Sequence, residues 1–439
     1  MSSSRGAGWV RATLCVTMAV ALAACGAGSR TGSETATKVA CDFEKPAEAV
    51  TVDVLAYNSS AIDPYTNTMV ASCSKNGVTV KHEPIDFGGQ VQKTTATLAG
   101  ETGTYDVLET YGFVIPQFAS GEKLRPLNEL FDKYSGEYGL DKINKSMRDT
   151  MSYDGKLYAL PMQAQMYVLA YRKDVFDKLG LKPPTTFAEL RAVSKKIQDA
   201  GEIKHPLALP WLASSDIITA YDAALGSLGT NLTDPAGKTA NLDTPQSKQA
   251  LQELLSLRPF MDPEVTTFDQ PAVQQQLFNG SAAIGIMFSG RMADLVNKSN
   301  TRFHDKFAFA PPPKVAENAP RQYSALSVDG WSIPRNTKVD PDLLFQVIAS
   351  SVSEEASKAS MPAAYPARDG MVSESSSPYA AAANDAIKNA PPAEPYPWTS
   401  QISNDIRPVV ADVLLGKTSV DQGTRQMQQI ATKILAGHQ

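Results

Sequence analysis

Residues 153–190 decide the fold, and they read YDGKLYALPMQAQMYVLAYRKDVFDKLGLKPPTTFAEL. The last part of this stretch predicts the start of a helix through a variant of the capping box, in which Thr186 is the N-cap residue and Glu189 stands at position N3. Strand and helix patterns alternate before the stretch, whereas most of the chain after it is patterned as helix. The fold to which this stretch belongs therefore has to be inferred together with the segments before and after it.

The segment before this stretch alternates short β-rich runs with helical runs. Strands are expected at 50–57, 77–82 and 105–109, and helices at 63–74, at 89–100 and up to residue 119. This alternation predicts a parallel sheet with helices on both faces. Because ligands of such sheets bind at the carboxyl ends of the strands, the loops at 58–59, 86–90 and 109–113 become candidates for a binding site.

The segment after the stretch is largely helical. Helices are expected at 217–228, 247–257, 272–279, 340–351, 401–415 and 420–435, and short strands at 282–287 and 331–333. The Pro-rich run 391–397 is expected to be an ordered loop, because Tyr396 lies within it and Trp398 follows it, between two helices.

The stretch 153–190 resembles a segment of the family 1 extracellular solute-binding proteins. In that family a DGK-x-Y-x-x-P strand precedes a strand ending in Tyr-Asn-Lys-Asp, and a Pro-Pro-x-Thr-x-x-Glu-Leu turn follows a helix; here Arg172 replaces the Asn. Further fragments follow in the family's order, namely FNGSAA at 278–283, PPPK at 311–314, DGWSIP at 329–334 and LGKT at 415–418. Each fragment alone is weak, but their order along the chain is specific.

The resemblance implies an α/β, two-lobed periplasmic-binding-protein fold with a hinge and an interlobe ligand cleft. The chain would cross between the lobes near 162–165, 327–331 and 365–370. Lobe I would comprise residues 46–164 plus 331–367, and lobe II residues 165–330 plus 368–439. The resemblance also implies a monomer that captures a sugar or sugar derivative, closes around it by a hinge motion and delivers it to the permease subunits of an ABC importer.

The N-terminus predicts export. Arg5 and Arg11 precede an apolar run, 12–24, that is too short for a membrane-spanning helix of about 20 residues. A basic region, a short apolar run and small residues together indicate a signal peptide, residues 1–24. Residues 22–26, LAACG, resemble the bacterial lipobox, which implies that Cys25 is lipidated, that 25–45 form a tether and that the protein is anchored to the outer face of the cytoplasmic membrane. A plain signal peptide with an incidental cysteine is the alternative.

Cysteine use agrees with export. Cys15 and Cys25 belong to the leader and the lipidation site, which leaves Cys41 and Cys73. A remaining pair in an oxidising compartment favours a disulfide, although two unpaired buried thiols would also fit the sequence. Two cysteines and four scattered histidines show no zinc-ligand spacing, so no metal site is expected.

Composition narrows the function further. About 400 residues remain after the leader, which is enough for two domains. The net charge is −5, with acids and bases mixed along the chain, and this excludes the concentrated basic face of a nucleic-acid-binding protein. The sequence contains no Gly-x-Ser-x-Gly elbow, no His-Glu-x-x-His and no suitable Cys–His pair, so we expect no enzyme and no cofactor.

A sugar site needs planar polar groups for hydroxyls and aromatic faces for C–H groups. Candidates must lie at strand ends or at the crossings that the family resemblance implies. The candidate ligand-binding residues are Glu109, Tyr111, Gln163, Gln165, Tyr167, Trp211, Ser289, Arg291, Asp329, Trp331, Arg368 and Trp398. Each has an ordinary structural alternative, such as packing for the tryptophans and a salt bridge or helix cap for the arginines.

The two arginines leave the ligand class open. Many sugar-binding relatives carry a stacking Trp where this chain has Arg291. If Arg291 and Arg368 both face the cleft, a sugar phosphate or phosphodiester is favoured, whereas Glu109 facing it would suit an amino sugar. A sensor on the same fold and a lipid-anchored hydrolase with two catalytic carboxylates remain alternative functions.

The lipobox resemblance generates a test of the anchor. Replacing Cys25 with Ala removes the thiol that would carry the lipids, so Cys25→Ala should release the protein from membranes or leave it unprocessed. Lipid labelling and membrane fractionation measure this. Behaviour of Cys25→Ala like that of the parent in both assays would rule out the lipoprotein interpretation.

Overall fold

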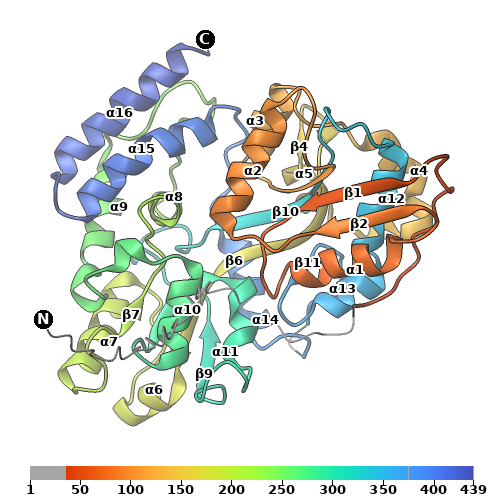
Figure 1. Cartoon of the computed structure of the whole chain (residues 1–439). Helices are drawn as coiled ribbons and strands as arrows, with labels where there is room; N and C mark the ends of the chain where they lie inside the picture. The colour runs from red at the N-terminus through yellow and green to blue at the C-terminus, as the bar shows by residue number, and fades with distance from the viewer. Residues whose placement is uncertain (1–35, 374, 439) are drawn as a thin grey trace, which may run out of the picture.

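Residues 36–373 and 375–438 are described by the computed structural model, so Cys25 and the expected signal peptide lie outside the described residues. Figure 1 shows two lobes joined by strands that cross between them. Lobe I carries β1, β2, α1 and α12, and lobe II carries α6 to α9 with the helical hairpin α15–α16. Among the described residues, no helix has the length and apolar character needed to cross a bilayer.

The strands form one sheet that runs through both lobes, in the order β2-β1-β3-β10-β6-β8-β7, with β9 and β11 pairing with β6. Their bounds are β1 (Val50–Leu55), β2 (Val78–His82), β3 (Val107–Tyr111), β6 (Leu160–Arg172), β7 (Leu207–Ala208), β8 (Ile284–Phe288), β9 (Phe307–Ala310), β10 (Leu326–Ser332) and β11 (Tyr365–Pro366). A separate hairpin joins β4 (Ser152–Tyr153) to β5 (Lys156–Leu157).

The expectation of a parallel sheet holds for only part of it. β1 is parallel to β2 and β3, and β7 is parallel to β8. The pairs that involve β6 and β10 are antiparallel. The chain passes between the lobes along these two strands in opposite directions. They therefore do not need the crossover helix that joins a pair of parallel strands.

β6 is the strand that belongs to both lobes. Its first half, Leu160 to Met166, pairs with β10, and its second half, Tyr167 to Arg172, pairs with β8 and β9. Twelve of its 13 residues are buried, as expected of a strand covered on both faces. Because side chains alternate along a strand, Gln163 and Gln165 share one face of β6.

Helices cover both faces of the sheet (Figure 1). Those of lobe I are α1 (Asp63–Cys73), α2 (Phe87–Ala99), α3 (Ile115–Ser120), α4 (Asn128–Tyr138), α5 (Lys145–Thr150), α12 (Pro341–Ser351) and α13 (Glu354–Ser360). Those of lobe II are α6 (Lys173–Leu179), α7 (Phe187–Asp199), α8 (Asp216–Ser227), α9 (Pro245–Leu255), α10 (Gln270–Asn279), α11 (Met292–Leu295), α14 (Ala380–Asn389), α15 (Thr399–Leu414) and α16 (Val420–Ala436).

Most expected elements exist, with shifted ends. The capping box is present, since Thr186 accepts a hydrogen bond from the Glu189 N–H at the start of α7. α2 begins at Phe87, two residues earlier than expected, because Asp86 caps it through the Gly89 N–H. β3 ends at Tyr111 rather than at residue 109. The run 391–397 forms an irregular loop before α15.

Three apolar cores support the lobes. One lies in lobe I and includes Val52, Phe345 and Trp331. A second lies in lobe II and includes Trp211. The third packs against the crossing strand β6 and includes Met166. All three cores contain residues of β6, with Leu160 in the first, Leu169 in the second and Met166 in the third.

The expected disulfide is confirmed. Cys41 and Cys73 are bonded, with their Cα atoms 5.5 Å apart. The bond ties the segment before β1 to the last residue of α1. It closes a loop of roughly 33 residues, which the chain-entropy estimate values at about 3–4 kcal/mol.

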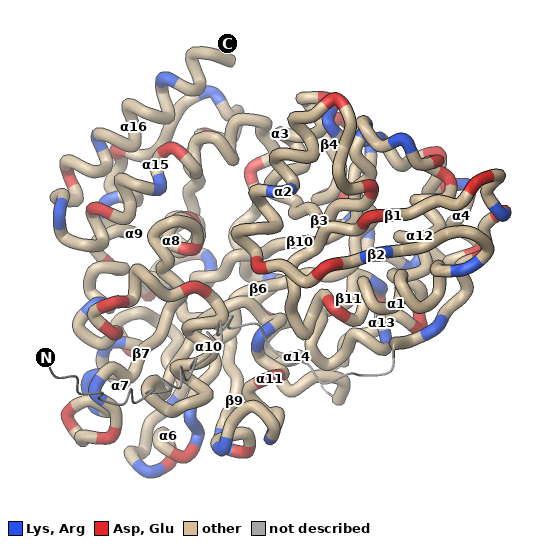
Figure 2. The backbone as a smooth tube through the Cα atoms, in the orientation of Figure 1, with Lys and Arg blue, Asp and Glu red and all other residues tan. Residues whose placement is uncertain are grey.

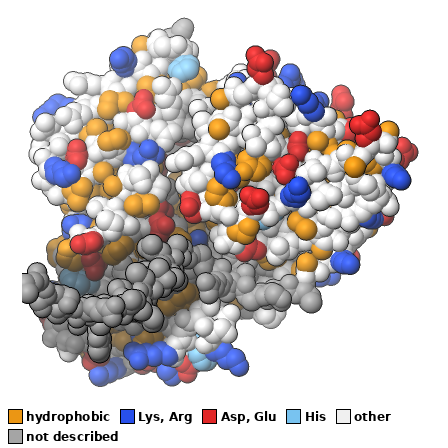
Figure 3. Space-filling view, in the orientation of Figure 1, with side chains coloured by type: hydrophobic (Ala, Val, Ile, Leu, Met, Phe, Trp, Pro, Cys, Tyr) orange, Lys and Arg blue, Asp and Glu red, His pale blue; other side chains and the backbone are white. Residues whose placement is uncertain are grey.

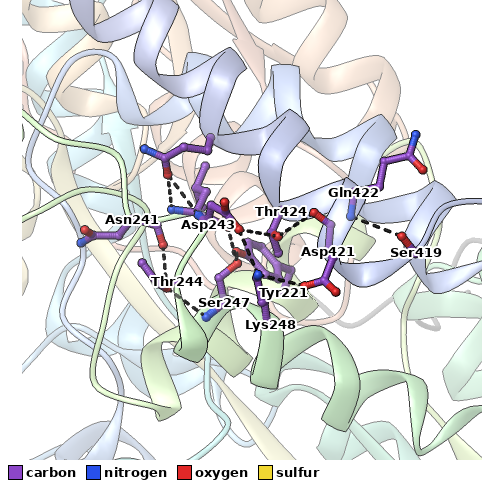
Figure 4. Close-up of polar contacts among 12 residues, drawn as sticks. Tyr221, Asn241, Asp243, Thr244, Ser247, Lys248, Ser419, Asp421, Gln422 and Thr424 are labelled. Carbon is purple, nitrogen blue, oxygen red and sulfur yellow. Dashed lines mark hydrogen bonds and ion pairs between the residues drawn. The ribbon is translucent and has the colours of Figure 1, made fainter.

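A polar network fixes the α15–α16 hairpin to α8 and α9 (Figure 4). The Tyr221 hydroxyl of α8 lies 2.7 Å from the Ser247 hydroxyl of α9. Lys248 of α9 forms an ion pair of 2.9 Å with Asp421 of α16, and Thr424 of α16 donates to Asp243 at 2.9 Å. These contacts join α8 to α9, and α16 to α9 and the segment before it.

Charges of both signs are mixed over both lobes. Figure 2 shows Lys and Arg interspersed with Asp and Glu along the chain, and the visible face in Figure 3 carries acidic and basic side chains side by side. A nucleic-acid-binding surface would require a concentrated basic face.

The disulfide gives a test of the fold. Replacing Cys41 and Cys73 together with Ser should lower the free energy of unfolding by about 3–4 kcal/mol, because the unfolded chain regains the freedom of that loop. Chemical denaturation measures the change. Dithiothreitol should destabilise the parent and leave the double variant unaffected; equal stability of parent and variant would contradict the expectation.

Candidate functional site

Three adjacent strands place polar side chains in one row between the lobes. In the sheet register Gln163 of β6 is opposite Asp329 of β10, and Asp329 is opposite Tyr111 of β3. A bulge between Asp329 and Gly330 interrupts the register with β6 at this point. Opposite residues share a face of the sheet, so the three side chains lie together. All three were expected from the sequence as site residues.

The Asp329 side chain makes more hydrogen bonds than the other two side chains in this row. Its Oδ2 accepts hydrogen bonds from Gln165 Nε2 at 2.6 Å and from Gln163 Nε2 at 3.1 Å. Its Oδ1 accepts from the Ser327 hydroxyl at 2.8 Å. Burial raises the pKa of Asp329 above its ordinary value, whereas these donors act in the opposite direction. The carboxylate thus ties β6 to β10 at the crossing.

Glu109 lies beside this cluster and is fully buried. Its Oε2 accepts the Tyr57 N–H at 3.0 Å, while its Oε1 is buried without a hydrogen-bond partner among the described residues. Burial raises the pKa of Glu109 well above its ordinary value, and the negative charge of Asp329 raises it further. A neutral Glu109 could donate a hydrogen bond, which an ionised one could not.

Four aromatic rings from lobe I line the site beside the polar row. Tyr57 meets Phe87 edge-on at 5.8 Å, Phe87 is tilted against Tyr111 at 5.6 Å, and Tyr111 stacks on Phe113 at 5.5 Å. Phe87 and Phe113 are 40% and 49% exposed, which is unusual for large apolar side chains. Exposed ring faces beside polar groups suit the C–H face of a sugar.

Lobe II contributes the end of β8 and the short turn that follows it. Gly290 contacts lobe I so closely that an added Cβ would lie 2.8 Å from Gln165 Oε1 and 3.0 Å from the Ala61 Cβ. Next to it, the Arg291 side chain is about nine-tenths buried. No hydrogen bond or ion pair joins its guanidinium to another described residue.

The positive charge of Arg291 acts on a residue of the opposite lobe. Burial raises the pKa of the Tyr57 phenol, as do the charges of Glu109 and Asp329, whereas the positive charge of Arg291 lowers it. Tyr57 belongs to lobe I and Arg291 to lobe II, so the charge acts across the space between them. The Ser289 hydroxyl, in the same turn, accepts the Met166 N–H at 3.4 Å.

The two lobes touch on either side of this site. The Ser60 hydroxyl of lobe I donates to Asp294 of lobe II at 3.0 Å, and the Gln274 amide donates to the same carboxylate at 3.0 Å. On the other side, the Ser400 hydroxyl at the start of α15 donates to the Phe113 carbonyl at 2.9 Å. The lobes are therefore in contact on both sides of the site.

Four of the expected site residues, namely Tyr167, Trp211, Trp331 and Arg368, lie elsewhere, and Tyr167 is buried in the core of lobe II. Trp211 is fully buried in the core of lobe II. Trp331 is opposite Glu109 in the register, but it is sealed in the core of lobe I. Trp398 stacks on Tyr396 and His438, each at 5.3 Å.

Arg368 was the second arginine expected at the cleft. Its guanidinium donates instead to the carbonyls of Val352, Gly139 and Tyr138, at 2.6, 2.8 and 2.5 Å. It therefore caps the ends of lobe I helices rather than facing the polar row. Of the two arginines, only Arg291 lies beside the row.

The structure adds residues that were not singled out from the sequence. The aromatic rings of Tyr57, Phe87 and Phe113 are the main addition; Phe87 and Phe113 lie in two of the loops expected to follow strands. Ser60 and Asp294 are the second addition, and nothing in the local sequence distinguishes them. No three His, Cys, Asp or Glu side chains gather in a metal-binding arrangement within residues 36–373 and 375–438.

The chain matches the family model described as bacterial extracellular solute-binding protein, over residues 67–358. A mannitol-binding protein of Pseudomonas aeruginosa is 25% identical over 248 residues, which cover 55% of this chain and 56% of the relative. A putative binding protein of Brucella abortus is 27% identical over 219 residues, 48% of this chain and 50% of the relative. The chain thus spans about half the length of these curated relatives.

Solved structures with bound sugars and polyols share the fold. A maltose-bound protein of T. maritima gives a TM-score of 0.79 at 19% identity, covering 88% of this chain and 100% of the other. A solute-binding protein of Agrobacterium radiobacter K84 in complex with ribitol also gives 0.79, at 21% identity, covering 89% and 100%. The two-lobed α/β fold expected from the sequence is confirmed.

The buried carboxyl of Glu109 predicts how stability depends on pH. Its folded-state pKa is raised, so the stabilisation is complete below the unfolded pKa of about 4.3 and is lost as the pH rises through the folded pKa. Glu109→Gln retains an acceptor for the Tyr57 N–H and cannot ionise. Relative to the parent, the ligand-free variant should be more stable at pH 8 than at pH 5, by on the order of 1 kcal/mol or more.

Thermal unfolding of ligand-free parent and variant across this pH range measures the effect. Glu317→Gln, at an exposed loop position, is the matched control and should follow the parent. Parallel curves for parent and Glu109→Gln would contradict the assignment.

Proposed function

We propose a function for this chain from the premise that it belongs to the family of bacterial extracellular solute-binding proteins: it captures a small sugar, polyol or sugar derivative between its lobes and delivers it to the permease of an ABC importer. The observation that carries the proposal is the convergence of Gln163, Asp329 and Tyr111 in one row between two lobes that are in contact. Residues from both lobes can then bind one solute at the same time.

The chemistry of the row supports a polyhydroxylated ligand. Gln163 Oε1 and Glu109 Oε1 are buried without partners among the described residues, and buried polar atoms are rarely left unpaired. A ligand with several hydroxyls could donate to both. The unpaired guanidinium of Arg291 offers a planar fork for vicinal hydroxyl oxygens, and the exposed faces of Phe87 and Phe113 offer apolar contact.

The descriptions of similar proteins also support a sugar or polyol as the ligand. Mannitol, maltose and ribitol appear in the descriptions of the relative and the two solved structures. We infer that this chain binds by the same kind of contact and acts by binding alone, without catalysis. The lobe division at 46–164 plus 331–367 and 165–330 plus 368–439 is part of the proposal, as is anchoring of the exported protein through Cys25, which the LAACG motif supports.

Direct titration tests the function. The purified parent should bind at least one member of a panel of maltose, maltotriose, D-mannitol, ribitol, D-glucose and D-glucosamine, detected by thermal shift and quantified by calorimetry. Heat release with one-to-one stoichiometry is the expected result. No binding to any member, by a protein shown to be folded, would reject the proposal in this form.

Closure of the two lobes should depend on the absence of a Cβ atom at Gly290. Gly290→Ala places a Cβ 3.0 Å from that of Ala61 and 2.8 Å from Gln165 Oε1, and overpacking of this kind costs about 1–3 kcal/mol. Because the contact joins opposite lobes, the cost falls on the closed, ligand-holding state, and affinity should fall about 5- to 150-fold. Calorimetry with the ligand of the parent measures it.

Gly136→Ala is the matched control. An added Cβ at Gly136, on α4, meets no atom within 4 Å, so its affinity should equal that of the parent. Equal affinity in Gly290→Ala would contradict the role of this contact in closure.

A further inference from the structure

The polar row runs across three neighbouring strands at the place where the chain passes between the lobes. Its members Gln163, Asp329 and Tyr111 lie on β6, β10 and β3, which are adjacent in the sheet. Adjacent strands are about 4.8 Å apart, so the row spans two spacings, or about 10 Å. Because β6 and β10 cross from one lobe to the other (Figure 1), a row at right angles to them lies along the space between the lobes.

The turn after β8 closes the β6 end of this row. β8 pairs with β6 on the side away from β10, and the Ser289 hydroxyl after it accepts the Met166 N–H at 3.4 Å. Gly290 then packs so closely that an added Cβ would lie 2.8 Å from Gln165 Oε1. The Ser60 Oγ of lobe I lies 3.3 Å from the Gly290 carbonyl oxygen. A solute cannot extend past this end of the row unless the lobes move apart.

The start of α15 closes the β3 end of the row. Phe113 follows β3 and stacks on Tyr111, with the ring centroids 5.5 Å apart and the ring planes at 8°. The Ser400 hydroxyl, in the first turn of α15, donates to the Phe113 carbonyl at 2.9 Å, and Ser400 is about nine-tenths buried. This direct hydrogen bond between the lobes leaves no space for a sugar ring at this end.

The two contacts leave room for one sugar unit along the row. A pyranose ring is about as long as one spacing between strands, whereas two linked rings need both spacings, including the ends that Gly290 and Ser400 contact. A longer ligand therefore has to break at least one of the two contacts. The hydrogen bonds lost between the lobes would lower the stability of the ligand-holding state, and with it the affinity.

We propose that these two interlobe contacts limit the length of the ligand, so that the site takes a single monosaccharide or alditol unit and discriminates against linear oligosaccharides. The inference rests on the proposed function and narrows its substrate class. The polar row binds the hydroxyls of that unit. Gly290 and Ser400 act through the approach of the lobes, and neither has to touch the ligand.

Matched ligands that differ only in length test the limit on the unmodified protein. D-glucose is compared with maltose and maltotriose, and D-glucitol and D-mannitol each with its α-glucoside. For any other panel member that binds, its own α-glucoside serves as the longer partner. Each is titrated into the parent by calorimetry. The one-unit ligand of at least one series should bind, and one added glucosyl unit should weaken binding at least about 10-fold, because hydrogen bonds between the lobes are lost.

Ser400→Ala tests the contact at the β3 end, because it removes the hydroxyl that joins the lobes. The one-unit ligand should bind about 2- to 10-fold more weakly. A longer ligand that already breaks this contact should lose no affinity, so the discrimination between the two lengths should shrink by the same factor. Ser60→Ala makes the corresponding change at the β6 end, where Ser60 contacts Gly290 and Asp294.

The discrimination should shrink in at least one of these two variants. Ser120→Ala, at an exposed position of lobe I, is the matched control for loss of a hydroxyl and should keep the discrimination of the parent. Equal losses of affinity for the short and the long ligand in both Ser400→Ala and Ser60→Ala would overturn the role of the contacts.

The remaining outcomes separate the two proposals. If the parent binds a longer ligand as tightly as its one-unit partner, or more tightly, the length limit is wrong and the sugar-binding function stands. If the parent binds no member of any series and none of the broader panel, the proposed function itself fails. The comparison within the parent decides the inference even if a variant does not fold.

Discussion

The carboxylate of Asp329 is the interaction on which the interlobe site depends. It accepts hydrogen bonds from Gln163 and Gln165 of β6 and from Ser327 of its own strand. β6 and β10 are the two strands along which the chain passes between the lobes, so this one group joins them at the crossing. Removal of this buried carboxylate would leave the Gln163 amide without its acceptor and the Gln165 amide with only the Tyr57 hydroxyl, which is costly in a dry interior.

The same constraint explains the arrangement of the rest of the site. Once Asp329 fixes β10 against β6, the register places Tyr111 of β3 in the same row. Glu109, two residues earlier on β3, then lies on the same face and is buried beside a second carboxyl. Burial raises the pKa of both carboxyls, and the negative charge of Asp329 raises the pKa of Glu109 further. The turn after β8 lies against this row, since Gly290 is in close contact with Gln165.

Much of this could be predicted from the sequence, because strand patterns and family motifs both place residues by their position along an element. Gln163, Glu109 and Tyr111 lie beside Asp329 for that reason. The tryptophans could not be placed in this way, since whether an indole faces a cleft or a core depends on which distant elements cover it. Trp211 is covered by the core of lobe II, and Trp398 is covered by Tyr396 and by His438 from the far end of the chain.

Arg368 shows the same limit for a charged residue. Its partners are carbonyls at Tyr138, Gly139 and Val352, and no local pattern indicates that helices so distant in sequence end beside it. The shifted end of β3 had a smaller effect, because a two-residue error leaves the alternation of faces unchanged. A two-residue error in a strand end therefore left the predicted residues on the correct face. An error about which distant elements surround a side chain, in contrast, misplaced Arg368.

Two lobes can approach each other closely only where small side chains face each other, and the residues at this contact are small. Ser60 and Ala61 of lobe I face Gly290 of lobe II, and a single added carbon at Gly290 would come within 3.0 Å of Ala61. Small residues here let Ser60 reach Asp294. A second contact between the lobes, from the Ser400 hydroxyl to the Phe113 carbonyl, lies at the start of α15. A bulkier residue than glycine at position 290 would therefore push the two lobes apart at the contact with Ala61.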